Sequence, residues 1–399
     1  MLFKIVCKND SNEVVMPYDT NKTYDHNLIQ KPLRLVILLG SKCQLHCDYC
    51  FQQNSSNHIP VDNFTPSKIE DFMKSLRKFD LSNISHVTLW GGEPLLYFKT
   101  IKQLVPRIRQ EYPHFKNFFI STNGLLLNQE TLEWLYENGI GMQISDDGKN
   151  QDRGLKAIQE FPRIRSFVKS FLETHPDMHV KINAVISKNN LDLYQFTKWA
   201  MQAYGENIKI SFNVLHTPVE DKDITNNSLY RFTDKQLQLV FTSTFKTFTE
   251  LTPSVRSRYD VYLHRLLKLG NIDTVCLSGR NAQLNVDVNG DTYVCNEFPF
   301  KQTRKFIKTN DRIKCNDCLV KNLCGGSCPL ISDKNVYCLC DLSFAFYYGI
   351  FCAIVHNTTG LDVYDIGVSN DLISRLGNKN DYDKAILNNR HSVINIQRL

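Results

Sequence analysis

Short apolar segments alternate with helical patterns along the first half of the chain. Residues 33–39 read LRLVILL and end at a glycine, which is typical of a strand buried on both faces. The same pattern predicts six strands, at 33–39, 86–90, 117–121, 142–145, 180–186 and 208–214. Helical patterns begin at Pro66 and continue at 99–112, 130–138, 154–173 and 193–204. Strands alternating with helices predict an α/β fold with a parallel sheet, wound as a partial (β/α)6 TIM-like barrel.

Unusual motifs follow the predicted strands. The first strand runs into SKCQLHCDYC, the second into GGEP, the third into STNG and the fourth into ISDDG. Because the carboxyl ends of parallel barrel strands meet at one face, these motifs are expected to form one site.

The rest of the chain divides by composition. Two helical patterns, 234–251 and 255–269, precede a cysteine-rich region, and the end of the chain is polar without a strong period. The predicted segments are 1–31 (leader), 32–232 (barrel), 233–274 (helical connector), 275–355 (C-terminal iron–sulfur domain) and 356–399 (appendage). The longest apolar run, 344–355, predicts a buried helix that is too short to span a membrane.

Composition is that of a globular protein, with 42% hydrophobic residues, 22% charged residues and a net charge of +6 in 399 residues. A charge this weak gives no reason to expect nucleic-acid binding. The opening MLFKIVCKND turns polar too early for a signal peptide, so a cytoplasmic protein is expected. The chain has 13 cysteines. Twelve of them lie in two groups, one early and one late, and Cys7 stands apart. In a reducing compartment, clustered thiols indicate metal or iron–sulfur ligation rather than disulfides.

The first group has the spacing C-x3-C-x2-C, at Cys43, Cys47 and Cys50. Three thiolates on one short loop suit three irons of a cubane cluster and leave the fourth iron open to a chelating molecule. A zinc site completed by His46 is the alternative, although zinc usually takes a fourth ligand outside such a spacer.

These motifs resemble those of the radical S-adenosylmethionine (SAM) superfamily, over residues 33–216. The resemblance implies that the three cysteines hold a [4Fe–4S] cluster whose open iron binds the methionine amino and carboxylate groups. One-electron reduction, from a donor such as flavodoxin or ferredoxin, would then release methionine and a 5′-deoxyadenosyl radical. The resemblance implies these cofactor contacts: Tyr49 near the adenine, Gly91, Gly92 and Glu93 at the amino group, Ser121 and Asn123 at the ribose, Ser145 and Asp147 on the next strand end, and Arg153 at the carboxylate.

The second group follows the pattern C-x9–15-G-x4-C, C-x2-C-x5-C-x3-C and a final cysteine, and it resembles the SPASM domain. Its cysteines are Cys276, Cys295, Cys315, Cys318, Cys324, Cys328, Cys338 and Cys340. The resemblance implies two auxiliary [4Fe–4S] clusters, hence three in all. A zinc ribbon is the alternative.

The resemblance also divides the ligands between the auxiliary clusters. Cys276, Cys295 and Cys328 belong to the first; Cys315, Cys318 and Cys324 belong to the second, with Cys338 or Cys340 completing it. Some relatives carry an extra cysteine soon after the first one, but none lies between Cys276 and Cys295. The first auxiliary cluster is therefore expected either to keep an open iron or to take Cys338, Cys340 or a non-cysteine ligand. Cys352, in an apolar run, and Cys7 are expected to be core residues.

Enzymes with this extension act on peptides and proteins, which makes a precursor peptide the expected partner. In the sulfatase-maturing branch, a catalytic aspartate follows the second SPASM cysteine. Asn296 stands there, and an amide is no general base, although Glu297 is adjacent. The favoured hypothesis is therefore a maturase that removes a side-chain hydrogen from a ribosomally made peptide and installs a crosslink. The CLCD run at 338–341 resembles the aromatic-crosslinking (cyclophane and darobactin) branch, while formylglycine formation and thioether formation remain alternatives.

Two further expectations concern partners. About 30 residues precede the first strand, too few for a winged-helix leader-binding module, so another surface or a separate protein is expected to bind the leader. An electron carrier with three clusters is the non-enzymatic alternative, but a carrier needs no nucleoside pocket at GGEP, STNG and ISDDG. The sequence identifies no catalytic acid or base.

Overall fold

The computed structural model describes most of the barrel and parts of the cysteine-rich region. The described residues are 2–7, 13–17, 31–50, 52, 61–149, 152–216, 227–267, 276–277, 282–296, 315, 318, 320–328, 331, 333–359 and 394–398.

An eight-stranded sheet organises the molecule, in the order β10-β9-β3-β4-β5-β6-β7-β8. Its parallel core comprises β3 (Arg34–Leu38), β4 (His86–Trp90), β5 (Asn117–Thr122), β6 (Ile140–Ser145), β7 (Val180–Ile186) and β8 (Lys209–Val214). The predicted α/β fold with a parallel sheet is confirmed, because each predicted strand lies within two residues of an observed one.

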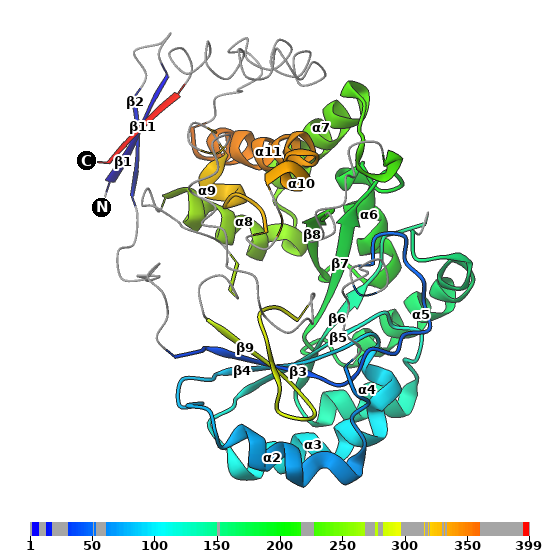
Figure 1. Ribbon diagram of the computed structural model, residues 1–399. Coiled ribbons are helices and arrows are strands. Elements are labelled where there is room, and N and C mark those ends of the chain that lie inside the picture. Colours follow the sequence, from blue (N-terminus) through cyan, green and yellow to red (C-terminus); the bar gives the residue numbers. More distant parts are fainter. Residues whose placement is uncertain are drawn as a thin grey trace.

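Helices cover the convex side of the curved sheet (Figure 1). They are α2 (Ile69–Leu76) after the 3-10 turn η1 (Pro66–Lys68), α3 (Phe98–Glu111) after η2 (Pro94–Tyr97), α4 (Gln129–Glu137), α5 (Leu155–Thr174) and α6 (Leu193–Tyr204). Side chains cap two of them: Asn128 accepts from the Thr131 amide at α4, and Asp192 accepts from the Gln195 amide at α6.

Strand alternation gives the sheet two different faces. Leu35, Ile37 and Leu89 are among the residues that face the helices, and they belong to one large buried core. The other face, here called the concave face, carries polar side chains: the Ser211 hydroxyl donates to the side-chain Oδ1 of Asn183 (2.8 Å). A polar interior suits a barrel that admits a ligand.

A strand from the cysteine-rich region extends the barrel sheet. β9 (Gln283–Asp287) pairs in parallel with β3, from Arg34↔Gln283 to Leu38↔Asp287, and β10 (Thr292–Tyr293) returns antiparallel beside β9. The sequence analysis predicted no strand here. The cysteine-rich region is thus joined to the barrel through its first strand.

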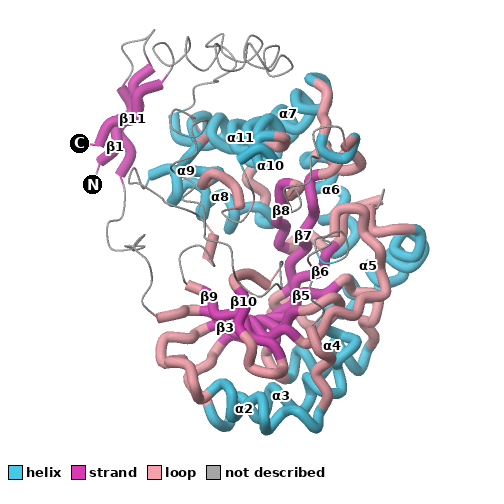
Figure 2. The backbone as a smooth tube through the Cα atoms, in the orientation of Figure 1, coloured by secondary structure: helices cyan, strands magenta, loops and turns pink. Residues whose placement is uncertain are grey.

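The helices after the barrel form a second layer (Figure 2). They are η3 (Ser228–Tyr230), α7 (Asp234–Glu250), α8 (Pro253–Leu267), α9 (Lys321–Cys324), α10 (Asp333–Tyr337) and α11 (Cys340–Thr359). The predicted buried helix is confirmed as α11, which begins earlier, at Cys340. It packs on α7, where Tyr348 stacks on Phe241 with ring centres 5.5 Å apart. Cys352 is 1% exposed in this core, as predicted.

The chain ends form a separate small sheet. β1 (Leu2–Cys7) pairs antiparallel with both β2 (Glu13–Pro17) and β11 (Ile394–Arg398). The sequence analysis predicted none of these strands. The side chain of Cys7 lies outside the described residues.

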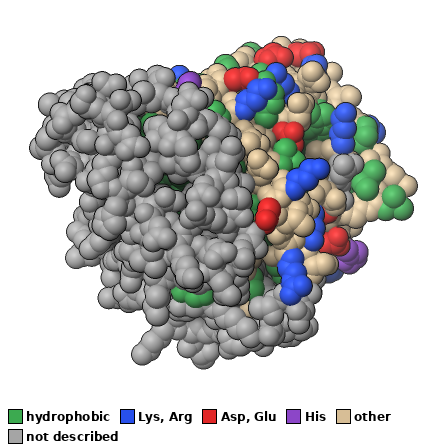
Figure 3. Space-filling view, turned by 90° about the horizontal axis from the view of Figure 1, so that it is seen from above, with side chains coloured by type: hydrophobic (Ala, Val, Ile, Leu, Met, Phe, Trp, Pro, Cys, Tyr) green, Lys and Arg blue, Asp and Glu red, His purple; other side chains and the backbone are tan. Residues whose placement is uncertain are grey.

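Two further observations concern the surface charge and the possibility of membrane-spanning helices. Basic and acidic side chains are interspersed over the part of the surface that Figure 3 colours by type. Within the described part of the chain, no helix is both long enough and apolar enough to cross a membrane.

Candidate functional site

The loop after β3 carries the first cysteine group and is bound to the end of β4. The Gly92 amide donates to the Gly40 carbonyl (2.9 Å), and the Glu93 amide donates to the Lys42 carbonyl (2.8 Å). These backbone hydrogen bonds hold GGEP directly against the cysteine loop, as the strand-end rule predicts.

Close packing explains why two glycines stand here. A Cβ atom on Gly91 would lie 2.6 Å from the Gly40 carbonyl oxygen, and one on Gly92 would lie 2.3 Å from the Lys42 carbonyl oxygen. Both contacts are with backbone, which cannot swing away as a side chain would. The sequence analysis explained these glycines by the approach of a ligand; the structure adds the approach of the cysteine loop itself.

The three thiols of the loop are half-buried and electrostatically coupled. Burial raises the pKa of the Cys47 thiol to about 12; the neighbouring Cys50 and Cys43 also raise it, while Arg153 lowers it. Among the described residues, no three His, Cys, Asp or Glu side chains converge on a single metal ion. A cubane does not require this, because each thiolate binds its own iron.

Asn123, predicted at the ribose, lies instead beside the cysteine loop. Its side-chain amide donates to the Cys43 sulfur (3.7 Å), and its oxygen accepts from the Leu125 amide (3.0 Å) and from Gln44 (3.3 Å). Ser121, at the end of β5, is half-buried and accepts from Gln143 (3.3 Å). Ser145 is half-buried at the end of β6. An amide donor at the sulfur would stabilise a negatively charged cluster, and the ribose contact of Asn123 stays a prediction.

Glu93 was predicted to pair with the methionine ammonium, but its carboxylate is fully buried and serves the chain. Oε1 accepts from the Leu95 amide (2.9 Å) and the Thr122 hydroxyl (2.7 Å), and Oε2 accepts from the Asn123 amide (2.7 Å). Burial raises the pKa of this carboxyl to about 7, and the hydrogen bonds oppose the rise. The side chain therefore ties the end of β4 to the end of β5.

The carboxylate of Asp147 likewise contacts other groups of the protein. Its Oδ2 accepts a short hydrogen bond from the Tyr49 hydroxyl and lies 2.9 Å from Arg153 Nε. Its Oδ1 accepts from Arg153 Nη2 (3.2 Å) and from the Val185 amide (2.9 Å). Three hydrogen bonds and the ion pair with Arg153 Nε therefore occupy most of the roughly four acceptor sites of this carboxylate, and its contact with a cofactor stays a prediction.

This geometry groups Tyr49 and Arg153 with Asp147. The Arg153 guanidinium lies 5.5 Å from the centre of the Tyr49 ring, and both residues are buried. Asp147 engages two of the five N–H groups of Arg153, which leaves others for the cofactor carboxylate that the sequence analysis predicted.

The adjacent Asp146 forms a second, similar group that faces the helices. Arg165 of α5 approaches both its oxygens (2.8 and 2.9 Å), and Tyr204 of α6 donates to Oδ2 (2.6 Å). Two neighbouring aspartates thus each hold an arginine and a tyrosine. One group lies at the cysteine loop, and the other fastens helices to the sheet.

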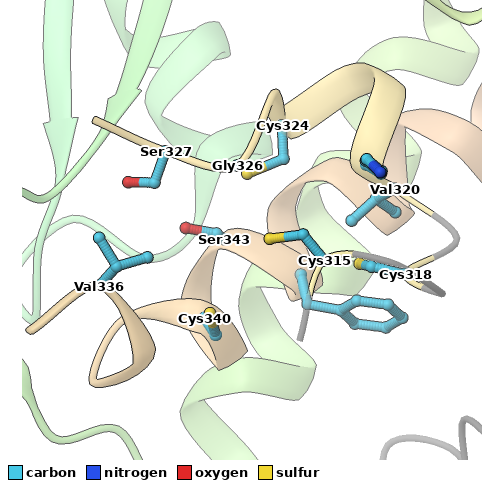
Figure 4. A pocket seen from close by; sticks show the side chains of 11 residues that line it. Cys315, Cys318, Val320, Cys324, Gly326, Ser327, Val336, Cys340 and Ser343 are labelled. Carbon is cyan, nitrogen blue, oxygen red and sulfur yellow. The ribbon is translucent and has the colours of Figure 1, made fainter. Parts of the chain in front are cut away.

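Four thiols of the second cysteine group converge on one pocket (Figure 4). They are Cys315, Cys318, Cys324 and Cys340. Burial raises the pKa of Cys318 to about 12, with further contributions from Cys324 and Cys315. The turn after Cys324 has three successive residues with positive φ, Gly325, Gly326 and Ser327, of which the last is strained.

The residues that line the pocket bear on whether Cys338 or Cys340 completes the second auxiliary cluster. Cys340 lines it, whereas Cys338 packs against the main core. Cys295 and Cys328, assigned together to the first auxiliary cluster, both pack against the small apolar cluster of Val294, Ile331 and Val336, and Cys340 does so as well. Cys276 is half-buried, and its membership of that set stays a prediction.

Comparisons with known proteins agree with this chemistry. The family model described as a 4Fe-4S single cluster domain matches residues 32–138, which contain the C-x3-C-x2-C and GGEP motifs. The radical SAM cyclopropyl synthase TigE of Paramaledivibacter caminithermalis is 23% identical over 178 residues, which are 41% of this chain and 37% of TigE. The chain is therefore similar to radical SAM enzymes.

Two further matches cover most of the chain. The chain is 22% identical over 356 residues to a cysteine-type anaerobic sulfatase-maturating enzyme of Clostridium perfringens, covering 77% of the chain and 94% of the relative. Its fold is similar to that of native anSMEcpe with bound AdoMet and the Kp18Cys peptide, with a TM-score of 0.59 and 19% identity, covering 83% of this chain and all of that one.

The residues of this chain fit the cofactors of radical SAM enzymes. Three thiols on one loop, with an amide donor at one sulfur, suit a [4Fe–4S] cluster with an open iron. Arg153 offers free donors to an anionic group at the same loop. A [4Fe–4S] cluster and S-adenosylmethionine are therefore its cofactors.

Sequence reasoning missed some polar residues at the site. Gln44 Oε1 and Trp90 Nε1 are buried without a hydrogen-bond partner among the described residues, at the cysteine loop and at the end of β4. Asp152 accepts from the Ser187 hydroxyl and from Asn189 (2.5 Å), and its carbonyl accepts from the Asp48 amide (3.0 Å). Their position in or beside the strand-end motifs was the available signal.

Asn296 lies where the sulfatase-maturing branch has its catalytic aspartate. Its oxygen accepts from the Gln283 amide of β9 (2.7 Å), and Gln283 also donates to Asn285 (2.7 Å). This amide network holds Asn296 as a hydrogen-bonding group without a titratable proton. Glu297 lies outside the described residues.

Proposed function

We propose that this radical SAM enzyme modifies a precursor peptide made on the ribosome. The observation that carries the proposal is the convergence of Cys315, Cys318, Cys324 and Cys340 on one pocket, in addition to the three thiols at the end of β3. A second thiol site is what the peptide-modifying branch adds to the radical-generating barrel. Peptide complexes of anSMEcpe, whose fold is similar, also support a peptide partner.

Three [4Fe–4S] clusters are proposed. Cys43, Cys47 and Cys50 hold the first, and Cys315, Cys318, Cys324 and Cys340 hold the second auxiliary one. The remaining set is Cys276, Cys295 and Cys328. When bound, the first cluster and S-adenosylmethionine supply a carbon radical able to take hydrogen from an unactivated carbon. The chain positions these groups through Asp147, which orients Tyr49 and Arg153.

The favoured modification is a crosslink between a side-chain carbon and an aromatic ring, carbon or oxygen. Joining two such groups removes two hydrogen atoms from the peptide. The 5′-deoxyadenosyl radical would take one of them, and the other would leave as a proton while its electron passes to an auxiliary cluster. Asn296 favours this reaction over formylglycine formation, because a side-chain amide held by Gln283 offers no general base. Recognition of a leader by a separate protein, and reduction by a flavodoxin or ferredoxin, complete the proposal.

Formylglycine formation is the second candidate, favoured by the similarity to sulfatase-maturating enzymes over most of their length. Its product differs in composition: a modified cysteine loses its sulfur, whereas a crosslinked peptide keeps every heavy atom. Mass spectrometry therefore separates the two reactions.

The decisive experiment uses anaerobically reduced, fully reconstituted protein. Release of 5′-deoxyadenosine from S-adenosylmethionine is expected, together with about 12 irons per chain if three cubanes are present. A peptide encoded beside the gene and co-expressed is expected to lose two hydrogens per linkage. Release of no 5′-deoxyadenosine refutes radical chemistry, whereas an unchanged peptide mass refutes only this substrate.

A further inference from the structure

A serine hydroxyl shares the pocket of the second cysteine group with the thiols. Ser343, in the first turn of α11, lines this pocket and is half-buried. Figure 4 shows its side chain between those of Cys324 and Cys340. Ser327 also lines the pocket, but in the same view its hydroxyl points away from the sulfurs. Ser343 is therefore the hydroxyl that lies among the thiols.

The position of Ser343 follows from helix geometry. It stands three residues after Cys340, and residues three apart on a helix lie on one face. The face of α11 that presents the Cys340 thiol to the pocket therefore presents Ser343 as well. The Ser343 amide donates to the Leu339 carbonyl (2.9 Å), which holds the residue in the first helical turn.

The hydroxyl of Ser343 has no hydrogen-bond partner within the described part of the chain. Other hydroxyls inside helices of this protein bond the carbonyl four residues back: Thr197 donates to Leu193 (2.8 Å) and Thr247 donates to Ser243 (2.7 Å). The equivalent carbonyl of Leu339 receives only the amide of Ser343. The hydroxyl is thus left to donate to a group in the pocket.

The charge of the pocket suits a negatively charged occupant. Lys321 lines it, and no carboxylate is among the described residues that line it; Asp341, next to Cys340, is not one of them. Reduction of an iron–sulfur cluster adds one negative charge. A hydrogen-bond donor at a sulfur therefore stabilises the reduced form more than the oxidised form and raises the reduction potential.

We propose that the Ser343 hydroxyl donates a hydrogen bond to a sulfur of the [4Fe–4S] cluster held by Cys315, Cys318, Cys324 and Cys340, and so raises its reduction potential. The inference rests on the auxiliary clusters of the proposed function. There, an auxiliary cluster receives the electron that crosslinking leaves, and Ser343 makes this pocket the favoured destination. Ser343 is a positioning residue, because it acts through the cluster and not on the peptide.

The test is a redox titration of anaerobic, reconstituted holoenzyme, followed by electron paramagnetic resonance. The component that Cys340→Ser lacks is assigned to this pocket. Ser343→Ala removes the hydroxyl, and Ser343→Thr keeps it. Ser327→Ala is the matched control, because it is the same chemical change in the same pocket at a hydroxyl that points away from the sulfurs.

Ser343→Ala is expected to lower the midpoint of this component alone. At a fixed potential, its ratio of reduced to oxidised cluster should fall at least about threefold, which is about 28 mV for a one-electron couple at 59 mV per tenfold. Ser343→Thr and Ser327→Ala are expected to keep the wild-type midpoint. A merely structural role of Ser343 would lower the thermal midpoint and leave the potential unchanged.

Three results overturn the inference: an unchanged potential in Ser343→Ala, an equal shift in Ser327→Ala, or an equal shift in Ser343→Thr. Failure of the proposed function has a different signature. If the wild type binds no iron beyond the first cluster, or if Cys340→Ser lacks no component, the proposed auxiliary cluster itself is rejected. About 12 irons per chain with an unshifted Ser343→Ala rejects only the hydrogen bond.

Discussion

The paired aspartates after β6 allow a matched test of the site. Asp147→Asn and Asp146→Asn are the same chemical change at adjacent positions, and both wild-type side chains are 0% exposed. Each aspartate holds an arginine, which is buried for Arg153 and half-buried for Arg165, and receives a tyrosine hydroxyl. The difference is location: Arg153 and Tyr49 belong to the site, whereas Arg165 and Tyr204 belong to α5 and α6.

The magnitude follows from the burial of each ion pair. Removing one partner of a buried pair leaves an uncompensated charge and costs about 3–5 kcal/mol of the free energy of unfolding. Both variants are expected to lose stability, Asp146→Asn toward the lower end of this range, because its arginine is half-buried whereas that of Asp147→Asn is buried. Only Asp147→Asn is expected to release Tyr49 and Arg153, and so to weaken S-adenosylmethionine binding by at least about tenfold.

The assay pairs two measurements on anaerobic holoenzyme. Thermal unfolding reports the shared loss of stability, and titration with S-adenosylmethionine, followed by the electron paramagnetic resonance signal of the reduced cluster, reports the site. Tyr49→Phe removes one hydrogen bond and no charge, so it keeps the test informative if Asp147→Asn does not fold. The reasoning is refuted if Asp146→Asn weakens cofactor binding as much as Asp147→Asn does.

Three further predictions concern the cysteine loop after β3, the pocket of the second cysteine group, and Lys181 of β7. Gly92→Ala places a Cβ 2.3 Å from the Lys42 carbonyl oxygen and is expected to lower the iron content measured after reconstitution, whereas Gly139→Asn, with open space around its Cβ, is expected to keep it. Cys340→Ser is expected to lose about four irons per chain and Cys338→Ser none, since only Cys340 lines the pocket; equal losses would contradict this assignment. Folded Lys181 has a pKa of about 8 against an ordinary 10.5, so the unfolded chain binds more protons between these values and stability is expected to rise with pH across this window. Lys181→Gln, compared by thermal midpoint, is expected to lack that rise.

Much of the barrel was predictable because its signals are local. Each strand is an apolar run such as 33–39, and each helix has its own period, so neither depends on distant residues. The spacing of Cys43, Cys47 and Cys50 is likewise local, and it indicated the chemistry before any contact was known. Strand-end placement of GGEP and ISDDG then followed from the parallel order of the strands.

Partners across the fold were decided only by the tertiary structure. Glu93 and Asp147 carry the residue types of a cofactor contact, but packing brings them to backbone amides, a hydroxyl and an arginine of the chain itself. Pairing of β9 with β3, and of β1 with β11, joins segments far apart in the sequence, where no local period signals a partner.

The cysteines and the lysines show what the sequence determined and what only the fold decided. The sequence by itself determined that thiols would gather in two groups, because their spacing is fixed along the chain; only the fold distinguished Cys340 from Cys338, two residues apart, by turning one toward the pocket. In the same way, composition reported a weak net charge, while strand register concentrated Lys181 and Lys209 on one face. Spacing and period act over a few residues, whereas the partner of a side chain depends on elements that meet only in the folded molecule.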